Sequence, residues 1–107
     1  MIIDTHVHIY NPFRPEGAPW PDPKNELLYR PTLPVHLKAQ AVPEGVVGAV
    51  VVEASAWISD NQWILDLAAA EPFILGLVGR LEPDDAGFEA DLDRLASQSL
   101  FRGVRFW

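Results

Sequence analysis

Four apolar segments recur along this chain, and more polar segments separate them. The first covers residues 2–9 and is rich in β-branched side chains, and three further apolar runs cover residues 46–53, 74–81 and 101–107. The stretch Val46–Val52 is almost uninterrupted, which is typical of a parallel strand buried on both faces. We therefore predict four strands at these positions.

The segments between the strands predict three helices. Residues 61–71 and 88–97 carry apolar side chains at helical spacing. Pro34 can lie in the first turn of a short helix over residues 35–42. Asp60 precedes the segment 61–71, and an aspartate at that point can cap the first turn of a helix. The expected order of elements is therefore a strand, a long loop, and then three helices that alternate with three strands.

A long segment rich in proline follows the first predicted strand. Residues 11–34 hold seven of the ten prolines of the chain, so a regular element is improbable there. Trp20, Leu27 and Tyr29 give this segment apolar anchors. Loops of this length are often functional, so we expect an ordered loop that lies over a neighbouring part of the fold.

Alternating helices and strands indicate an α/β fold with a parallel sheet. A doubly wound nucleotide-binding sheet would place a glycine-rich loop after its first strand, whereas this chain places His6 and His8 there. Polar residues at carboxyl strand ends favour a (β/α)8 TIM barrel, which takes about 250 residues. We predict that residues 1–107 are a single incomplete domain, the N-terminal half of such a barrel with about four β/α units. A complete small four-stranded domain is the alternative.

The charge and residue composition of the chain exclude some kinds of binding partner. The 107 residues include 15 acidic and 8 basic side chains, a net charge of −7, and no basic run. This balance argues against nucleic acid or an anionic membrane as a partner. There is no cysteine, no basic leader and no apolar run near the roughly 20 residues of a membrane span. We expect a cytoplasmic protein that binds a small molecule, and the exposed sheet edges leave open an association between copies.

The opening strand contains the sequence DTHVH. Side chains alternate along a strand, so Asp4, His6 and His8 point to one face. Two imidazoles at positions i and i+2 can bind one metal ion, and Asp4 can orient a histidine as a hydrogen-bond acceptor. Two ordinary strand histidines are the competing interpretation, and the residues alone favour neither.

Charged residues also lie near the ends of the other predicted strands. Glu53 follows the second strand and could bind a substrate hydroxyl or a metal, or pair with an arginine. Arg80 and Arg105 are candidates to bind a substrate carboxylate, because guanidinium binds carboxylate in a bidentate manner. An internal ion pair with Glu53 or Asp4 is the competing interpretation for both arginines, and the favoured one for Arg105.

Aromatic residues are candidates for the walls of a binding pocket. Trp20 lies in the loop that leaves the predicted site, and Trp57 follows the second strand. Trp63 falls on the apolar face of the second helix and is expected in the core. His36, the third histidine, is expected at the surface of the first helix.

Several segments together resemble one family. The segments IIDTHVHIYNP, VVVEAS, DNQWILDLA, ILGLVGRLEPD and LFRGVRFW, in this order, are similar to the N-terminal portion of the amidohydrolase superfamily. More narrowly, the whole chain resembles the amidohydrolase-2 group of metal-dependent TIM-barrel hydrolases. The branch that it resembles most includes sugar lactonases and the 2-pyrone-4,6-dicarboxylate lactonase.

This resemblance implies a function and a site. It implies a hydrolase that acts on a small lactone or a related cyclic ester or amide, with water activated by a divalent metal, and zinc is the expected ion. His6 and His8 match the ligands of the first strand. GVRFW lacks a lysine or glutamate to bridge two ions, which favours one ion or none, and some lactonases of this branch work without metal.

The same resemblance leaves the complete reaction open. The family aspartate that transfers the proton is expected beyond Trp107, so the catalytic residue is not assigned within this chain. A decarboxylase of the same superfamily is one alternative function. A catalytically inactive half barrel is the other, because this segment alone lacks part of the family site.

Overall fold

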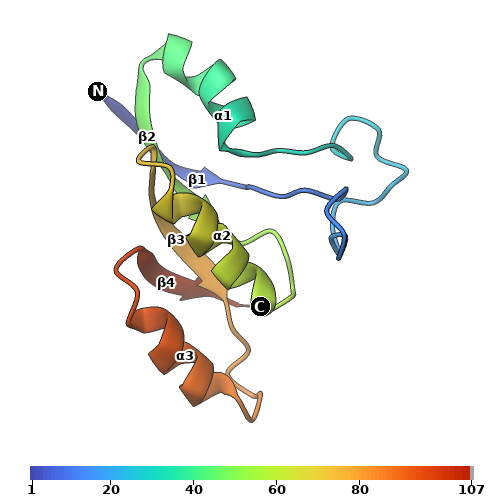
Figure 1. Cartoon of the computed structure of the whole chain (residues 1–107), viewed down its shortest axis with the longest axis vertical. Coiled ribbons are helices and arrows are strands. Elements are labelled where there is room, and N and C mark those ends of the chain that lie inside the picture. Colours follow the sequence, from blue (N-terminus) through green and yellow to red (C-terminus); the bar gives the residue numbers. More distant parts are fainter. Residues whose placement is uncertain (107) are drawn as a thin grey trace.

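The computed structural model describes residues 1–106 and contains one sheet of four parallel strands. The strands are β1 (Ile2–Val7), β2 (Val46–Val52), β3 (Ile74–Arg80) and β4 (Phe101–Arg105). They lie side by side in the order of the sequence (Figure 1). A classic doubly wound sheet reverses its strand order, whereas a barrel adds each strand next to the last. The predicted α/β architecture of a partial barrel is therefore confirmed, with four parallel strands that alternate with three α-helices in the described residues.

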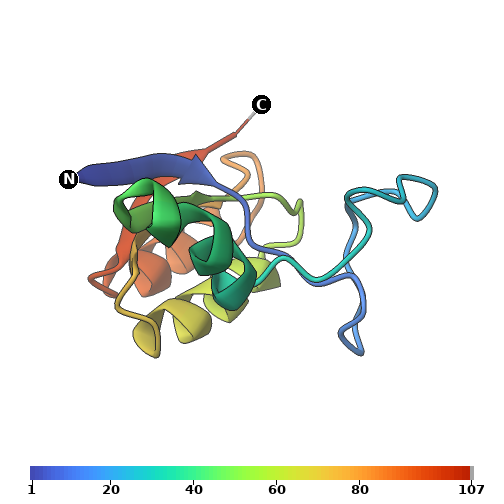
Figure 2. The ribbon, with the colours of Figure 1, turned by 90° about the horizontal axis from the view of Figure 1, so that it is seen from above.

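All helices lie on the same face of this sheet. They are α1 (Pro34–Ala41), the short 3-10 helix η1 (Val42–Glu44), α2 (Ser59–Ala69) and α3 (Phe88–Ala96). The view from above shows the three α-helices on one side of the strands, and no helix on the other (Figure 2). Because each crossover passes over the same face, the opposite face of the sheet is left open along the described residues.

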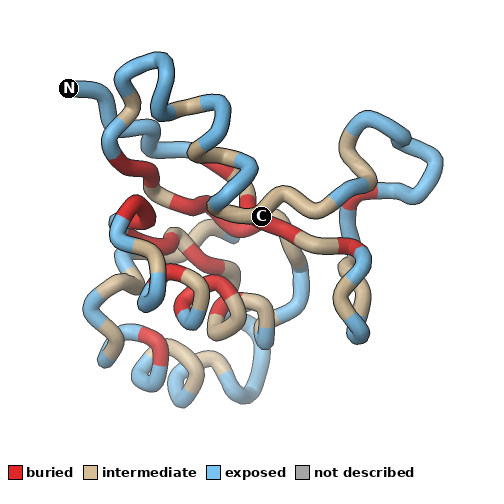
Figure 3. The backbone as a smooth tube through the Cα atoms, turned by 45° about the horizontal axis from the view of Figure 1, so that its top comes forward, coloured by how far each residue is buried: buried red, intermediate tan, exposed pale blue. Residues whose placement is uncertain are grey.

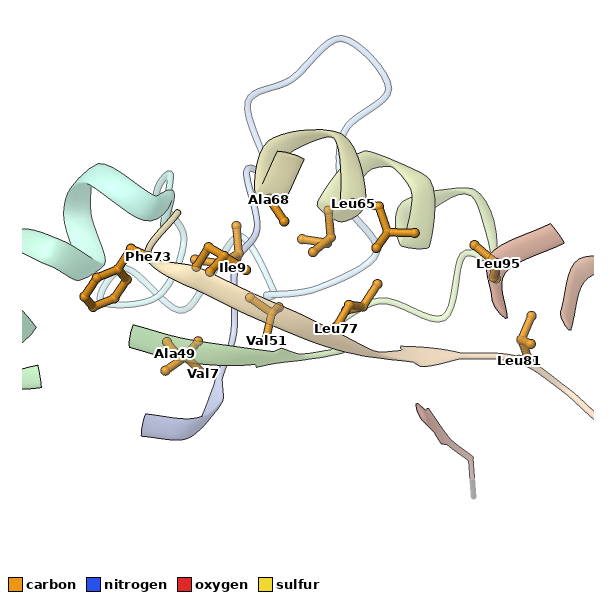
Figure 4. Close-up of a cluster of buried hydrophobic side chains, with 12 residues drawn as sticks. Val7, Ile9, Ala49, Val51, Leu65, Ala68, Phe73, Leu77, Leu81 and Leu95 are labelled. Carbon is orange, nitrogen blue, oxygen red and sulfur yellow. The ribbon is translucent and has the colours of Figure 1, made fainter. Parts of the chain in front are cut away.

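The core lies between the middle strands and α2. Ala49 and Val51 of β2 and Leu77 of β3 are at most 1% exposed, and they pack beneath Leu65 and Ala68 of α2 (Figure 4). Alternate residues of the strands reach this layer, as the pleat of a strand requires. Trp63 is only partly buried and packs against the edge of this core, as its position on the helix predicts.

Two details of these elements differ from the predictions. α2 begins at Ser59, and Asp60 makes no capping hydrogen bond. Its carboxylate instead forms an ion pair with Arg14 in the long loop, at 2.5 Å. β1 ends at Val7 rather than at Ile9, because the chain turns away from β2 after that residue. Trp107, which the sequence places in the fourth strand, lies outside the described residues.

The first strand is largely exposed. Ile2 and Ile3 are 51% and 46% exposed, and only Val7 and Ile9 of this segment reach the core. Side chains on the face opposite His6 and His8 therefore pack into the core only toward the carboxyl end of this segment. Figure 3 shows the contrast between this exposed segment and the buried middle strands.

The long loop is divided into a packed part and a projecting part. Tyr10 and Thr32 exchange two backbone hydrogen bonds, of 3.0 and 2.8 Å, which close the base of the loop. Within it, Arg14 is tied to α2 and Trp20 packs on Tyr10, with ring centroids 5.1 Å apart. The tip, residues 22–27, is exposed and extends away from the sheet (Figure 2). The loop therefore lies over a neighbouring part of the fold, as expected, around Arg14 and Trp20, and its tip at residues 22–27 is exposed to solvent.

Among residues 1–106, no helix has the length and apolar character needed to cross a bilayer.

Candidate functional site

The two histidines of the opening strand lie side by side. His6 belongs to β1 and His8 is the first residue after it. Their ring centroids are 5.2 Å apart, with the ring planes at 90°. This proximity follows from the alternation of strand side chains, which places positions i and i+2 on one face. The predicted pair of imidazoles is therefore formed by the fold, at the carboxyl end of β1.

His8 is held by a hydrogen bond from the neighbouring strand. Its Nδ1 lies 2.9 Å from the carbonyl oxygen of Val52. A carbonyl oxygen can only accept, so Nδ1 is the donor, and Nε2 is the nitrogen left to bind an ion. This arrangement is typical of a metal-ligating histidine, whose second nitrogen donates to a backbone carbonyl. The donor set at His8 thus fits a divalent ion.

Asp4 makes a different contact from the expected one. Its Oδ1 accepts a hydrogen bond from the backbone N–H of His6 at 3.1 Å. This contact orients the backbone at His6 and does not involve an imidazole ring. Asp4 is also exposed, so its predicted role as a partner of a metal ligand stays a prediction.

The described residues supply only part of a metal site. Within residues 1–106, no group of three or more histidine, cysteine, aspartate or glutamate side chains is placed to hold an ion. Catalytic zinc is held by three protein ligands and one open position. His6 and His8 can therefore serve as two of these ligands, and a complete site needs at least one from elsewhere.

An open hollow of about 320 Å³ lies at the carboxyl ends of the strands. Its lining includes one predicted site residue from each strand end and one from the long loop, namely His8, Glu53, Arg80, Arg105 and Trp20. These residues are far apart in the sequence and meet because parallel strands end at the same edge of a sheet. The fold thus collects five of the predicted residues in one place.

Both arginines of this hollow already have carboxylate partners. Arg105 donates from Nε to Oε1 of Glu53 at 2.8 Å and from its terminal nitrogen to the backbone oxygen of Glu53 at 3.0 Å. Arg80 donates from Nε to Oε1 of Glu82 at 2.7 Å. Glu53 is buried, and a buried carboxylate needs such a partner. The ion-pair interpretation of Arg105 is therefore the one that the structure shows.

The predicted tryptophans take different positions. Trp20 lies over His8, with ring centroids 6.3 Å apart, and so forms one wall of the hollow. Trp57 is 38% exposed and lines a smaller, adjoining pocket near Arg14. His36 is exposed on α1, as expected, and its Nδ1 accepts the backbone N–H of Leu33.

Two residues that shape the site were missed by the sequence analysis. Asn61 is 3% exposed and ties α2 to β3, since its amide accepts from the N–H of Arg80 at 2.9 Å and donates to the carbonyl of Arg80 at 2.7 Å. It shares the apolar face of α2 with Ile64 and Ala68, and a polar residue in such a stripe was a usable signal. Arg14 carried no comparable signal.

Sequential parallel strands with helices on one face are the arrangement that (β/α)8 barrels use, and here two histidines lie side by side at the end of the first strand. The family model described as Amidohydrolase matches residues 3–106. The chain therefore belongs to the amidohydrolase family, as its resemblance predicts.

Comparisons with known proteins agree with this assignment. The chain is 30% identical over 103 residues to L-fucono-1,5-lactonase of Burkholderia ambifaria, a match that covers 96% of this chain and 35% of that protein. A zinc-bound amidohydrolase of Burkholderia multivorans superposes with a TM-score of 0.79 at 25% identity, over 97% of this chain and 36% of its own.

A HEPES-bound structure of an amidohydrolase from the same organism gives a TM-score of 0.81 at 24% identity, again over 97% and 36% of the two chains, and supports the fold. The chain thus spans about a third of the length of the proteins that it matches.

Proposed function

We propose that the gene product containing this chain hydrolyses a small lactone, with His6 and His8 as two ligands of one divalent ion. The observation that carries this proposal is the imidazole pair at the carboxyl end of β1, in a chain 30% identical to L-fucono-1,5-lactonase. When bound, a divalent ion would polarise the lactone carbonyl and lower the pKa of a water molecule. Zinc is the expected ion, since the amidohydrolase from Burkholderia multivorans holds it.

The reaction requires little from the described side chains beyond binding and orientation. Water adds to the carbonyl carbon, the ring C–O bond breaks, and the ring oxygen leaves as a hydroxyl. The product is a hydroxy acid, which releases one proton at neutral pH. His8 is oriented for its part by the carbonyl of Val52, which fixes the nitrogen that faces away from β2. By the family resemblance, we expect the proton-transfer aspartate beyond Trp107.

The charges of the hollow favour a neutral substrate. Each guanidinium is balanced by a carboxylate, Arg105 by Glu53 and Arg80 by Glu82. A substrate carboxylate would have to displace one of these partners and leave a carboxylate without its cation, which is costly for the buried Glu53. Hydroxyl groups can instead donate to these carboxylates without disrupting the pairs. A hydroxylated lactone therefore suits this site better than a dicarboxylate lactone does.

The test measures proton release by the complete gene product on a panel of lactones. The panel contains L-fucono-1,5-lactone, other sugar lactones and 2-pyrone-4,6-dicarboxylate. We expect turnover of a sugar lactone, zinc in the purified protein, and a loss of at least about 100-fold in kcat/KM for His6→Ala and His8→Ala. His36→Ala is the matched control, since it removes the third histidine, which is exposed on α1.

Each other result has a definite meaning. Turnover that survives in both histidine variants contradicts the proposed site. Turnover that survives complete metal removal, yet is lost in the histidine variants, would show that the histidines act on the substrate directly. Release of carbon dioxide from a carboxylated substrate, with no lactone hydrolysis, would favour the decarboxylase.

A further inference from the structure

The long loop is attached to α2 by a single buried arginine. The side chain of Arg14 is only 7% exposed, and its terminal nitrogen lies 2.5 Å from Oδ1 of Asp60 at the start of α2. Its Nε donates to the carbonyl of Gly17 at 2.7 Å. One guanidinium thus joins the loop to itself and to the helix.

Two tryptophans and a second carboxylate also lie near this arginine, and Oε1 of the exposed Glu16 is 3.5 Å from its Nε. The guanidinium carbon of Arg14 lies 4.5 Å from the ring centroid of Trp63 and 5.9 Å from that of Trp57. Both distances are within the range of a cation–π contact. A planar cation with several donors can satisfy a carboxylate, a carbonyl and two aromatic faces at once, which an ammonium cannot. We call Arg14 and Asp60 with these two tryptophans the arginine clasp.

The arginine clasp lies next to the wall of the hollow. Trp20 follows Arg14 by six residues, and it contacts both Tyr10 and His8, at 5.1 and 6.3 Å between ring centroids. Arg14 and Trp20 also line the same small pocket, between the loop and α2. Pro21, next to Trp20, is buried, and residues 22–27 beyond it are exposed. Among the described loop residues, the clasp is the ion pair that ties this wall to α2.

We propose that Arg14 is a positioning residue, which holds Trp20 against His8 through the arginine clasp. This proposal rests on the proposed lactone site only for its kinetic consequence. Without the clasp, the first half of the loop would keep its backbone closure at Tyr10 and Thr32 but lose its tie to α2. Trp20 would then leave His8 for part of the time, and the hollow would lose one wall.

The kinetic consequence is a change in substrate binding. A wall that packs on substrate but not on the reacting carbonyl contributes equally to the ground state and the transition state. We expect Arg14→Met to raise KM about tenfold and to leave kcat within about threefold. Trp20→Ala should raise KM by a similar factor. Because both act on one contact, the double variant should exceed either single variant by less than about threefold.

A spectroscopic measurement tests the same contact without substrate. The NMR chemical shifts of the His8 imidazole protons should include a ring-current contribution from Trp20. His36 lies on α1 and serves as the reference signal in the same spectrum. Arg14→Met should move the His8 signals toward their positions in Trp20→Ala and leave the His36 signals unchanged. Arg14→Lys should move them by an intermediate amount, since one ammonium cannot bind both Asp60 and Gly17 as the guanidinium does.

The control is Arg94→Met. Arg94 pairs with Asp91 on the exposed side of α3, at 3.3 Å. The substitution therefore removes an arginine and an ion pair that do not belong to the loop. We expect neither KM nor the His8 signals to change in this variant. If Arg14→Met does not fold, Asp60→Asn removes the charge of the clasp and is measured in the same way.

The outcomes separate this proposal from the proposed function. His8 signals that stay in place in the folded Arg14 or Asp60 variant, yet move in Trp20→Ala, would overturn the positioning role. Additive effects on KM would also overturn it. If no lactone is hydrolysed, the proposed function fails, and the His8 signals still decide whether Arg14 positions Trp20.

Discussion

The middle of the sheet and its first strand consist of similar apolar residues and yet occupy opposite environments. Ala49, Val51 and Leu77 are at most 1% exposed beneath α2, whereas Ile2 and Ile3 are about half exposed. The middle strands have a neighbour on each side and a helix above, and β1 pairs only with β2 within the described residues. The burial of a strand is thus decided by the strands and helices that pack against it. Its hydrophobicity alone does not predict this burial.

The two regions also differ in what they supply. The middle of the sheet contributes most of the buried apolar surface, which is the main stabilising term of a fold. The end of β1 contributes His6 and His8, whose rings lie side by side and which we propose as metal ligands. Substitutions in the middle should therefore change stability, and substitutions at β1 should change activity.

The largest expected loss of stability comes from Leu77→Ala. This side chain is 1% exposed between β3 and α2, so its removal loses apolar burial and leaves a cavity. We expect the free energy of unfolding to fall by about 2–5 kcal/mol. Urea denaturation measures it, and Leu75→Ala, on the same strand but 38% exposed, is the control and should cost about 1 kcal/mol or less. Equal losses would contradict the burial pattern.

The next-largest loss of stability is expected at Gly79, which lies in β3 with Leu77. A Cβ at Gly79 would clash with the Asn61 side chain and lie 2.8 Å from the ring of Phe101. Gly79→Ala should therefore destabilise the protein by about 1–3 kcal/mol, because it displaces the amide that ties α2 to β3. Gly103→Ala is the matched control, since its Cβ would meet nothing nearer than 4.0 Å. A harmless Gly79→Ala would mean that Asn61 can move freely.

Substitutions of His6 and His8 should change the free energy of unfolding little, in contrast to their large expected effect on activity. In the metal-free protein, His6→Ala should change the free energy of unfolding by no more than about 0.5 kcal/mol, since His6 is exposed. His8→Ala removes a hydrogen bond to Val52 and should cost about 1 kcal/mol. Urea denaturation after metal removal measures both, because a bound ion would add its own stabilisation. A loss above that of Leu77→Ala would assign these residues to the core.

The smallest effect on stability is expected at the ion pair between Lys38 of α1 and Glu71, which precedes β3. The hydrogen bond from Lys38 and that from the backbone N–H of Phe73 hold the pKa of the Glu71 carboxyl below its usual range. The folded state therefore binds the proton less readily than the unfolded state does. This contribution to stability is complete above the ordinary glutamate pKa and is lost as the pH falls through the lowered value.

The variant Glu71→Gln tests this contribution. It should remove this part of the pH dependence and leave the stability at neutral pH slightly reduced. Denaturation of the two proteins across acidic pH measures the difference, with Glu89→Gln on the exposed side of α3 as the control. Parallel stability profiles would show that Glu71 is not coupled to folding.

Much of the architecture could be predicted from the pattern of residues. The apolar run of β2 and the helical spacing of Ile64 and Ala68 place a strand and a helix correctly, because the pleat and the helical turn impose periods of two and 3.6 residues. The same alternation places His6 beside His8. These are local relations, and they depend only on the geometry of a single element.

The remaining features depend on contacts between distant segments. Arg105 binds Glu53 across 52 residues, and Arg14 binds Asp60 across 46. Neither pairing has a local signal, since each charge had several partners available until the sheet order and the path of the long loop were set. The cap expected from Asp60 was wrong for this reason, because a buried guanidinium outcompetes the helix terminus for the carboxylate.

The sequence alone therefore specifies the four strands, the three helices and the histidine pair, which follow from local periodicity, and the family, which follows from the resemblance of several segments in order. Only the tertiary structure settles that β1 is exposed, that the arginines of the hollow are neutralised, and that Trp20 lies over His8. The physical reason is that the burial and the ion pairing of a side chain depend on the residues around it. The parallel sheet determines those residues, because it brings strand ends that are distant in the sequence to one edge.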